Sequence, residues 1–280
     1  MNYRHAFHAG NHADVLKHTV LLALVDALQR KDGACFFLDS HAGPGRYALD
    51  DARAARTGEA REGVARLSRE DGLEAPALRR YLEAIRRHNP DGGLRVYPGS
   101  PLLLADALRA QDRLACCELH PEEAASLRQL LRGDPRIGVH QRDGYEALSA
   151  LLPPQEKRGL ALIDPPYEAQ SDEYDRIFPA LRNALSRWPK AVYALWYPIK
   201  QGRALHPMLR RAATLPVERL LRVELLVRAD DSPLRMNGSG LLILNPPWQI
   251  EQALQPVLPI LRDRLGEAGA TCRLDWLRGG

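Results

Sequence analysis

Cysteine is scarce in this sequence, and long apolar runs are missing from it. Four cysteines occur among 280 residues, and no two are spaced as Cys-x-x-Cys. All lie in apolar stretches, so free buried thiols are expected rather than a disulfide framework or a zinc site. They are Cys35, Cys116, Cys117 and Cys272. No apolar stretch approaches the roughly 20 residues that a membrane-spanning helix needs.

The N-terminus lacks the apolar core and the small-residue cleavage site of a secretory signal. A cytoplasmic protein without a membrane partner is therefore expected. The net charge of +4 comes mostly from arginine and is compatible with a polyanionic partner. The length predicts one main domain, 1–280, and a monomer is the working expectation.

Short apolar runs alternate with segments of helical periodicity, which indicates β-α units around a mostly parallel sheet. The last two runs follow each other without a long helix, which predicts a hairpin and an antiparallel strand. The seven runs are 34–38, 114–117, 137–140, 160–163, 191–196, 220–227 and 240–244. Such a sheet binds ligands at the carboxyl ends of its strands, so the residues just after each run are the candidates.

An insertion interrupts the first β-α-β unit. The acidic residue that binds a ribose usually follows the glycine loop by about 20 residues, but here Glu118 follows Gly45 by about 70. We place an inserted helical subdomain at 47–96 and expect the chain to resume with a helix over 102–109, with Ser100 as its N-cap. Its arginines could bind RNA phosphates or form an ordinary solvated face; they are Arg79, Arg80, Arg86 and Arg87.

Three strand ends together predict a site for an adenosine-containing ligand. The first strand runs into His41-Ala42-Gly43-Pro44-Gly45, where glycines allow the backbone to approach a cofactor, although a plain tight turn would look the same. After the second strand, Glu118 can accept both ribose hydroxyls. After the third, Asp143-Gly144 offers an acid for the adenine amine.

The fourth strand ends in Asp164-Pro165-Pro166-Tyr167, which is the strongest single motif. Two prolines fix an extended backbone and hold the Asp164 side chain at the strand's end. A carboxylate and a carbonyl can each accept one N–H of an adenine amine and so direct its lone pair toward an electrophile. The alternative is a plain strand-terminating turn.

Two other segments allow more than one interpretation. The second Pro-Pro tetrapeptide, 245–248, follows a late strand, so a rigid turn is favoured over a substrate contact. Four N-terminal histidines could bind metal, and His8 and His12 would share one face of a helix. Because Gly10-Asn11 indicates that the helix begins only near Asn11, we favour a segment that covers the cofactor and contacts RNA, with surface histidines as the alternative.

With these motifs together, the chain closely resembles the RlmJ-type 23S ribosomal RNA (adenine-N6) methyltransferases. The resemblance covers nearly the whole length and includes the Y-R-H-x-F-H-A-G-N-H-A-D-V-L-K-H opening, D-x-H-A-G-x-G, G-S-P, E-L-H-P, D-P-P-Y, A-L-W-Y-P and N-P-P-W. It implies a Rossmann-like class I S-adenosylmethionine-dependent fold with a seven-stranded, mostly parallel sheet and an inserted helical subdomain.

The resemblance also implies roles for single residues. The cofactor would be S-adenosylmethionine, and an N-terminal segment of about 1–18 would contact cofactor and RNA. Catalysis would rest on Asp164 as proton acceptor, the Pro165 carbonyl as its helper and Tyr167 stacking on the target base, with Tyr3 and Arg4 also contacting RNA. The cofactor-binding residues would be His18, His41, Gly43, Ser100, Glu118, Asp143, Gly144 and Asp164.

The predicted reaction is methyl transfer to the N6 amine of an adenine in 23S ribosomal RNA, without a metal. One alternative is an adenine-N6 methyltransferase acting on DNA, although that substrate favours a larger target-reading domain. A second is an RNA-binding protein without turnover, which would not need a carboxylate facing a polyanion. A third is a metal-dependent hydrolase that uses the N-terminal histidines.

Overall fold

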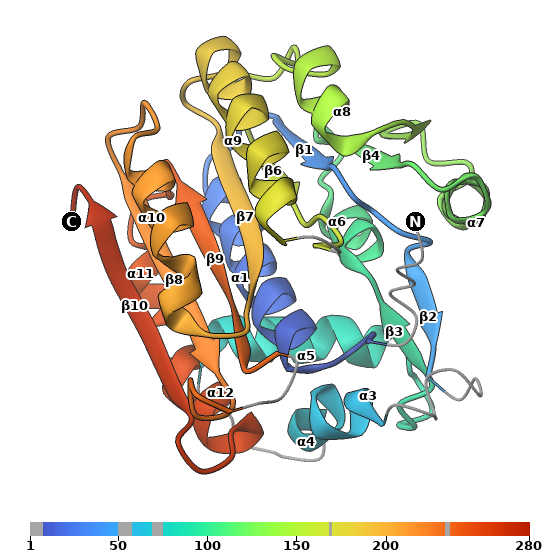
Figure 1. Ribbon diagram of the computed structural model, residues 1–280. Helices are drawn as coiled ribbons and strands as arrows, with labels where there is room; N and C mark the ends of the chain where they lie inside the picture. The colour runs from blue at the N-terminus through green and yellow to red at the C-terminus, as the bar shows by residue number, and fades with distance from the viewer. Residues whose placement is uncertain (1–7, 50–57, 69–74, 168–169, 233–235) are drawn as a thin grey trace.

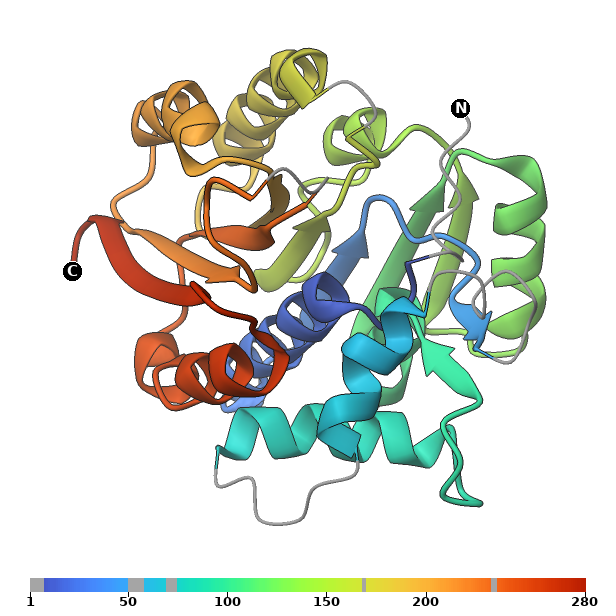
Figure 2. The same cartoon turned by 60° about the horizontal axis from the view of Figure 1, so that its bottom comes forward.

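A sheet of eight strands forms the centre of the protein and lies between two layers of helices (Figure 1, Figure 2). The computed structural model describes residues 8–49, 58–68, 75–167, 170–232 and 236–280. The strand order is β10-β8-β9-β7-β6-β1-β4-β5. The strands are β1 (Cys35–Asp39), β4 (Arg113–Glu118), β5 (Ile137–Gln141), β6 (Arg158–Ile163), β7 (Val192–Ile199), β8 (Leu220–Leu226), β9 (Gly238–Leu244) and β10 (Thr271–Arg278).

Five neighbouring strands, from β5 to β7, are parallel, and β9 lies antiparallel between β7 and β8. All residues of β1 are buried because both faces of the sheet are covered, which explains its continuous apolar sequence. The expected mostly parallel sheet with a late antiparallel strand is confirmed. The eighth strand, β10, was not predicted.

One helical layer holds α1 (His12–Gln29), α6 (Ser100–Ala107), α7 (Pro121–Leu130), α11 (Ile250–Leu254) and α12 (Val257–Leu265). The opposite layer holds α8 (Gly144–Ala150), α9 (Gln170–Arg187) and α10 (His206–Ala213), the last preceded by a short 3-10 turn, Gly202–Leu205. Because both layers bury apolar side chains, the open positions of the sheet lie at the ends of its strands.

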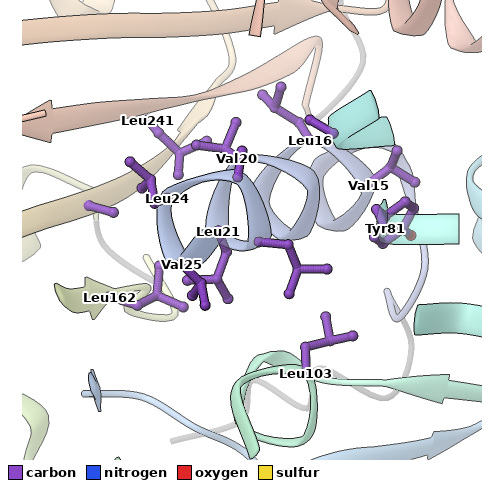
Figure 3. Close-up of a cluster of buried hydrophobic side chains, with 14 of the residues drawn as sticks. Val15, Leu16, Val20, Leu21, Leu24, Val25, Tyr81, Leu103, Leu162 and Leu241 are labelled. Carbon is purple, nitrogen blue, oxygen red and sulfur yellow. The ribbon is translucent and has the colours of Figure 1, made fainter. Parts of the chain in front are cut away.

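Helix α1 is buried on nearly all sides, and side chains from α5, α6, β6 and β9 surround it (Figure 3). It begins as expected at Asn11, whose Oδ1 accepts hydrogen bonds from the amides of Ala13 (2.9 Å) and Asp14 (3.0 Å). A helix that is apolar around its circumference is stable only inside a protein. The few polar side chains of α1 are therefore held in fixed surroundings.

The segment predicted as an insertion leaves and rejoins the sheet domain through a two-stranded ribbon. Strands β2 (Arg46–Ala48) and β3 (Val96–Pro98) pair antiparallel, with Tyr47 opposite Tyr97. Between them lie α3 (Glu59–Glu62), α4 (Val64–Ser68) and α5 (Pro76–Arg87). Helix α5 packs along α1, so these helices extend the same core (Figure 2).

The four cysteines are free thiols. Three are buried, as expected, but Cys272 is half-buried near the start of β10. That strand alternates polar and apolar residues and forms an edge of the sheet, so it protects its side chains less than the central strands do.

Candidate active site

A cavity of about 360 Å³ opens at the carboxyl ends of β1, β4 and β6. The structure brings all eight residues predicted to bind cofactor to its wall, together with Pro165. These eight come from α1, α6, α8, the end of β4 and three loops, so only the fold assembles them. The eight are His18, His41, Gly43, Ser100, Glu118, Asp143, Gly144 and Asp164.

The glycine loop and Glu118 form one wall of this cavity. Gly43 has φ 63°, in the left-handed region, and a Cβ there would meet the Tyr47 hydroxyl at 2.6 Å. The two carboxylate oxygens of Glu118 accept hydrogen bonds from the amides of Gly43 (2.8 Å) and His120 (2.7 Å). This carboxylate is thereby fixed at the end of β4. Next to it, Leu119 is 49% exposed and gives the cavity an apolar wall that the sequence analysis missed.

Asp143 performs two structural tasks at the start of α8. Its Oδ1 accepts hydrogen bonds from the amides of Tyr145 (2.9 Å) and Glu146 (3.2 Å), and its Oδ2 accepts one from Arg176 (2.7 Å). Burial acts to raise the pKa of this carboxyl, but these hydrogen bonds outweigh burial and hold the pKa below its ordinary value. Asp143 therefore remains an anion at the cavity wall, able to accept a further hydrogen bond.

His41 lies between β1 and α8. Its Nδ1 is 2.7 Å from the Ser40 hydroxyl, and its ring meets Tyr145 edge-on with centroids 5.0 Å apart. Burial lowers the pKa of His41 to about 4, so the ring is neutral at physiological pH. Gly144 leaves room for it, because a Cβ at that position would lie 2.6 Å from the ring.

His18 is tied to the inserted segment by a chain of buried hydroxyls. Its Nδ1 lies 2.7 Å from the Tyr97 hydroxyl, which lies 3.2 Å from the Tyr81 hydroxyl. All three residues are at most 1% exposed. Tyr81 belongs to α5 and Tyr97 to β3, so the inserted segment supports the cofactor wall, a connection that the sequence did not reveal.

Lys17 forms a buried ion-pair network with two carboxylates. Its Nζ lies 2.8 Å from Asp14 and 2.5 Å from Asp164, with the lysine side chain only 4% exposed. Burial alone acts to lower the pKa of Lys17, but the two carboxylates more than offset it and raise that pKa. Lys17 was not predicted as a site residue, although a single lysine inside an otherwise apolar helix was a signal of a buried charge.

The structure places the Tyr167 ring away from the cavity. Its ring is 7% exposed and packs edge-on against Tyr174 and Trp196, with 5.7 Å between centroids in each case. Its hydroxyl donates a hydrogen bond to the Trp196 carbonyl (2.7 Å), and its backbone has φ 47°. In this conformation the ring belongs to the core and has no open face on which a base could stack.

The tetrapeptide 245–248 lies at the amino ends of the parallel strands, opposite to Asp164 at their carboxyl ends, because β9 runs antiparallel to β7. Asn245 donates hydrogen bonds to the carbonyls of Pro189 (2.8 Å) and Ala191 (2.9 Å), which makes it part of a turn. Trp248 is 73% exposed there. The first Pro-Pro motif thus lines the cavity, whereas the second does not.

The N-terminal histidines His8 and His12 differ in their surroundings. His8 Nδ1 lies 2.8 Å from a Glu59 carboxylate oxygen, whereas burial near Arg228 lowers the pKa of His12 to about 4. Within the described ranges, no three His, Cys, Asp or Glu side chains are grouped as a metal site would require. Tyr3 and Arg4 lie outside the described residues.

The arginines of the inserted segment lie on the outer face of α5. Arg80 is half-buried and lies 3.5 Å from Asp26 of α1, while the other three are exposed: Arg79, Arg86 and Arg87. A role in RNA binding stays a prediction for them. No helix in the described part of the chain is long and apolar enough to cross a membrane.

Comparison with known proteins gives consistent matches. The family model described as "Ribosomal RNA large subunit methyltransferase D, RlmJ" matches residues 32–278. The chain belongs to the RlmJ family. It is 43% identical to ribosomal RNA large subunit methyltransferase J of Escherichia coli (strain K12), with 96% of this chain and 95% of that protein covered. For the Haemophilus influenzae protein of the same name, identity is 38% and coverage 99% of each.

The crystal structure of protein LPL1258 from Legionella pneumophila str. Philadelphia 1 shares this architecture, with a TM-score of 0.86 and 36% identity. The alignment covers 96% of this chain and 98% of that one. Together with the strand order, membership of the RlmJ family confirms the Rossmann-like class I methyltransferase fold. The sheet has eight strands rather than the seven expected.

Proposed function

We propose that the protein transfers a methyl group from S-adenosylmethionine to the N6 amine of an adenine in 23S ribosomal RNA. The observation that carries this proposal is the position of Asp164 and Pro165 at the wall of the cavity that also holds His18, Glu118 and Asp143. Hydrogen-bond acceptors for the target amine and residues suited to bind a nucleoside thus line the same cavity.

The charges of the cavity fit the two ends of S-adenosylmethionine. Glu118 and Asp143 supply acceptors for ribose hydroxyls and the adenine amine, and Leu119 supplies an apolar surface for the flat ring. At the other end, Lys17 and His18 lie where an amino-acid carboxylate can be accommodated. When bound, this cofactor supplies an electrophilic methyl group on a sulfonium.

The chain's own residues orient the target amine. The lone pair of the adenine amine is delocalised into the ring, so it must be directed before it can react. Lys17 holds Oδ2 of Asp164, and no described residue hydrogen-bonds to Oδ1. Oδ1 and the Pro165 carbonyl each accept one N–H, which turns the lone pair toward the methyl group, and Asp164 takes up the proton that leaves.

The RNA reaches this site with its adenine unpaired, because an amine within a duplex cannot reach the methyl group. Tyr3, Arg4 and the exposed arginines of α5 contact the RNA. A stacking role for Tyr167 requires the loop after β6 to rearrange, since the ring is buried against Trp196. The protein acts as a monomer in the cytoplasm and needs no metal.

The test is transfer of labelled methyl from S-adenosylmethionine to protein-free 23S ribosomal RNA and, in parallel, to duplex DNA. Nucleoside analysis should find the label in N6-methyladenosine from RNA alone. Label in DNA would keep the chemistry and overturn the substrate. Binding of RNA with no transfer to free RNA or to precursor particles would leave an RNA-binding protein instead.

A further inference from the structure

Each of the two cavity histidines, His18 and His41, is held at Nδ1 by a buried hydroxyl group. A neutral imidazole has one N–H and one lone pair, and the hydrogen bond at one nitrogen selects what the other offers. The hydroxyl beside each ring therefore determines whether that ring presents a donor or an acceptor to the cavity.

Only one arrangement of protons makes both contacts of the Ser40 hydroxyl hydrogen bonds. Its hydroxyl lies 2.9 Å from the Leu162 carbonyl oxygen and 2.7 Å from Nδ1 of His41. A carbonyl oxygen can only accept, so the hydroxyl donates its single proton to Leu162. Nδ1 of His41 must then carry a proton and donate it to Ser40, which leaves Nε2 with a lone pair.

The tyrosine chain requires the opposite arrangement at His18. Among the described residues, the Tyr81 hydroxyl has the Tyr97 hydroxyl as its one hydrogen-bond partner. Buried donors are rarely left unpaired, so Tyr81 donates to Tyr97, and Tyr97 donates to Nδ1 of His18. The reverse order would leave a buried O–H of Tyr81 without an acceptor. Nδ1 of His18 is therefore an acceptor, and Nε2 carries the proton.

We propose that these buried hydroxyls give the two histidines opposite polarity, so that His18 donates a hydrogen bond from Nε2 to the cofactor and His41 accepts one at Nε2. Tyr97, Tyr81 and Ser40 are positioning residues, which act through the rings and touch no ligand. The identity of the ligand rests on the proposed function, whereas the protonation pattern does not.

Opposite polarity suits a ligand that carries both kinds of group. His18 shares its end of the cavity with Lys17 and Ser100, where the carboxylate of the amino-acid part is the acceptor. His41 adjoins Gly144 and the anionic wall at Asp143, where an N–H or O–H of the ligand is the donor. Two rings of equal polarity would leave one of these groups unmatched.

The inserted segment thereby acquires a role in cofactor binding. Tyr81 comes from it and Tyr97 from strand β3, where it rejoins the sheet domain, and neither faces the cavity itself. Burial raises the pKa of both hydroxyls, so neither ionises at physiological pH. Each hydroxyl therefore keeps its proton and its donor role in the hydrogen bonds from Tyr81 to Tyr97 and from Tyr97 to His18.

The direct test is the long-range proton–nitrogen NMR spectrum of the full chain labelled with ¹⁵N-histidine, without ligand. His18→Gln and His41→Gln spectra assign the signals. His18 should show a pyridine-like Nδ1 and a pyrrole-like Nε2, and His41 the reverse. The same pattern at both rings, or a protonated Nδ1 at His18, overturns the proposal, and neither result bears on methyl transfer.

Binding of S-adenosylhomocysteine, measured by calorimetry, gives a second test. Tyr97→Phe should weaken binding about tenfold, because His18 loses the donor that fixes its tautomer. Tyr193→Phe is the matched control, since it removes a buried hydroxyl bound only to the carbonyls of Ala184 and Trp188, and it should bind within about twofold of wild type. Equal affinity of both variants would contradict the proposal.

If Tyr97→Phe fails to fold, Tyr81→Phe serves in its place. It leaves the Tyr97 hydroxyl but removes the donor that sets its direction. A mixture of both tautomers at His18 is expected in its NMR spectrum. An unchanged single Nε2–H form would contradict the proposal that the Tyr81 hydroxyl sets the direction of the hydrogen bonds to His18.

Discussion

At the scale of single residues, the carboxylate of Asp164 is the group on which turnover depends most directly. Asp164→Asn keeps the shape of the side chain but replaces one acceptor oxygen by a donor, which cannot receive an amine N–H. We expect kcat to fall at least about a hundredfold while S-adenosylhomocysteine binding changes little. Single-turnover methyl transfer and calorimetry measure the two quantities, and a near wild-type rate would remove Asp164 from its assigned role.

Gly144 shows how tightly the cavity wall is built. A Cβ at this position would lie 2.2 Å from the Ser40 carbonyl oxygen and 2.6 Å from the His41 ring. Gly144→Ala must therefore shift the backbone, at a cost of about 1–3 kcal/mol of stability, and we expect cofactor affinity to fall at least about tenfold. Gly33→Ala, with no atom closer than 3.8 Å, is the control, and calorimetry that finds both variants alike would contradict this reading.

The sequence predicted the cofactor-wall residues at the ends of β1, β4, β5 and β6, because strand ends converge in a doubly wound sheet, and added His18 and Ser100 only through the resemblance to the RlmJ family. It did not predict the partners of those residues. The contacts of His18 with Tyr97 and of Lys17 with Asp164 join residues 79 and 147 positions apart. The burial of the Tyr167 ring was not predictable for a similar reason, since its backbone conformation and its hydrogen bond to Trp196 direct the ring into the core.

At the scale of elements, α1 positions both Lys17 and His18, so its packing should control stability and activity together. Leu21 is fully buried in this helix. Leu21→Ala should lower the free energy of unfolding by about 3 kcal/mol, from lost apolar contact and the cavity left behind. Urea denaturation measures this change. Leu21→Met nearly conserves the volume and should cost less than about 1.5 kcal/mol, so equal losses would indicate that the site is loosely packed.

The contact between α3 and the start of α1 should make stability depend on pH. The hydrogen bond and charge of Glu59 raise the pKa of His8 above 6.5, and the contacts with His8 and Asn11 outweigh burial and lower the pKa of Glu59. A raised histidine pKa adds stability below 6.5 that is lost as pH rises through the folded value. The stability contributed by the Glu59 carboxylate is lost as pH falls through the lowered pKa of Glu59.

Glu59→Gln removes this pair. The difference in Tm between wild type and Glu59→Gln should therefore be larger at pH 6 than at pH 8.5, although partial exposure of both side chains keeps it small. Thermal unfolding followed by circular dichroism at the two pH values is the measurement. A difference that grows toward pH 8.5 would show that the pair does not form as described.

Seven of the eight strands were predictable because buried strands are continuous apolar runs. Strand β10 escaped because its residues alternate between half-buried and exposed, as in Thr271-Cys272-Arg273-Leu274. An alternating strand resembles a polar loop when only apolar runs are sought. The helical start at Asn11 was predicted correctly from a local signal, the N-cap side chain, but the expected N-cap at Ser100 was wrong, because α6 begins at Ser100 with Gly99 as its N-cap.

At the scale of the whole molecule, the two Pro-Pro motifs, 164–167 and 245–248, lie at opposite ends of the strands because β9 runs antiparallel to β7. Asp164 lies at the cavity, whereas Trp248 lies exposed beyond the opposite ends of the strands. Trp248→Ala should therefore leave the rate of methyl transfer within about twofold of wild type, because surface changes rarely exceed about 0.5 kcal/mol. Single-turnover methyl transfer checks this, and a loss of rate comparable to that of Asp164→Asn would show that residues at both ends of the strands take part in the reaction.

The buried Lys17 has a consequence for how this protein can change over generations. It forms ion pairs with both Asp14 and Asp164, and removing one member of a buried ion pair costs about 3–5 kcal/mol. A lineage that no longer needed the reaction would still lose stability by substituting Lys17 alone, because both carboxylates would lose their ion pair with it. The three residues should therefore vary together or remain, so that selection for a folded chain preserves the means of catalysis even where selection for catalysis is relaxed.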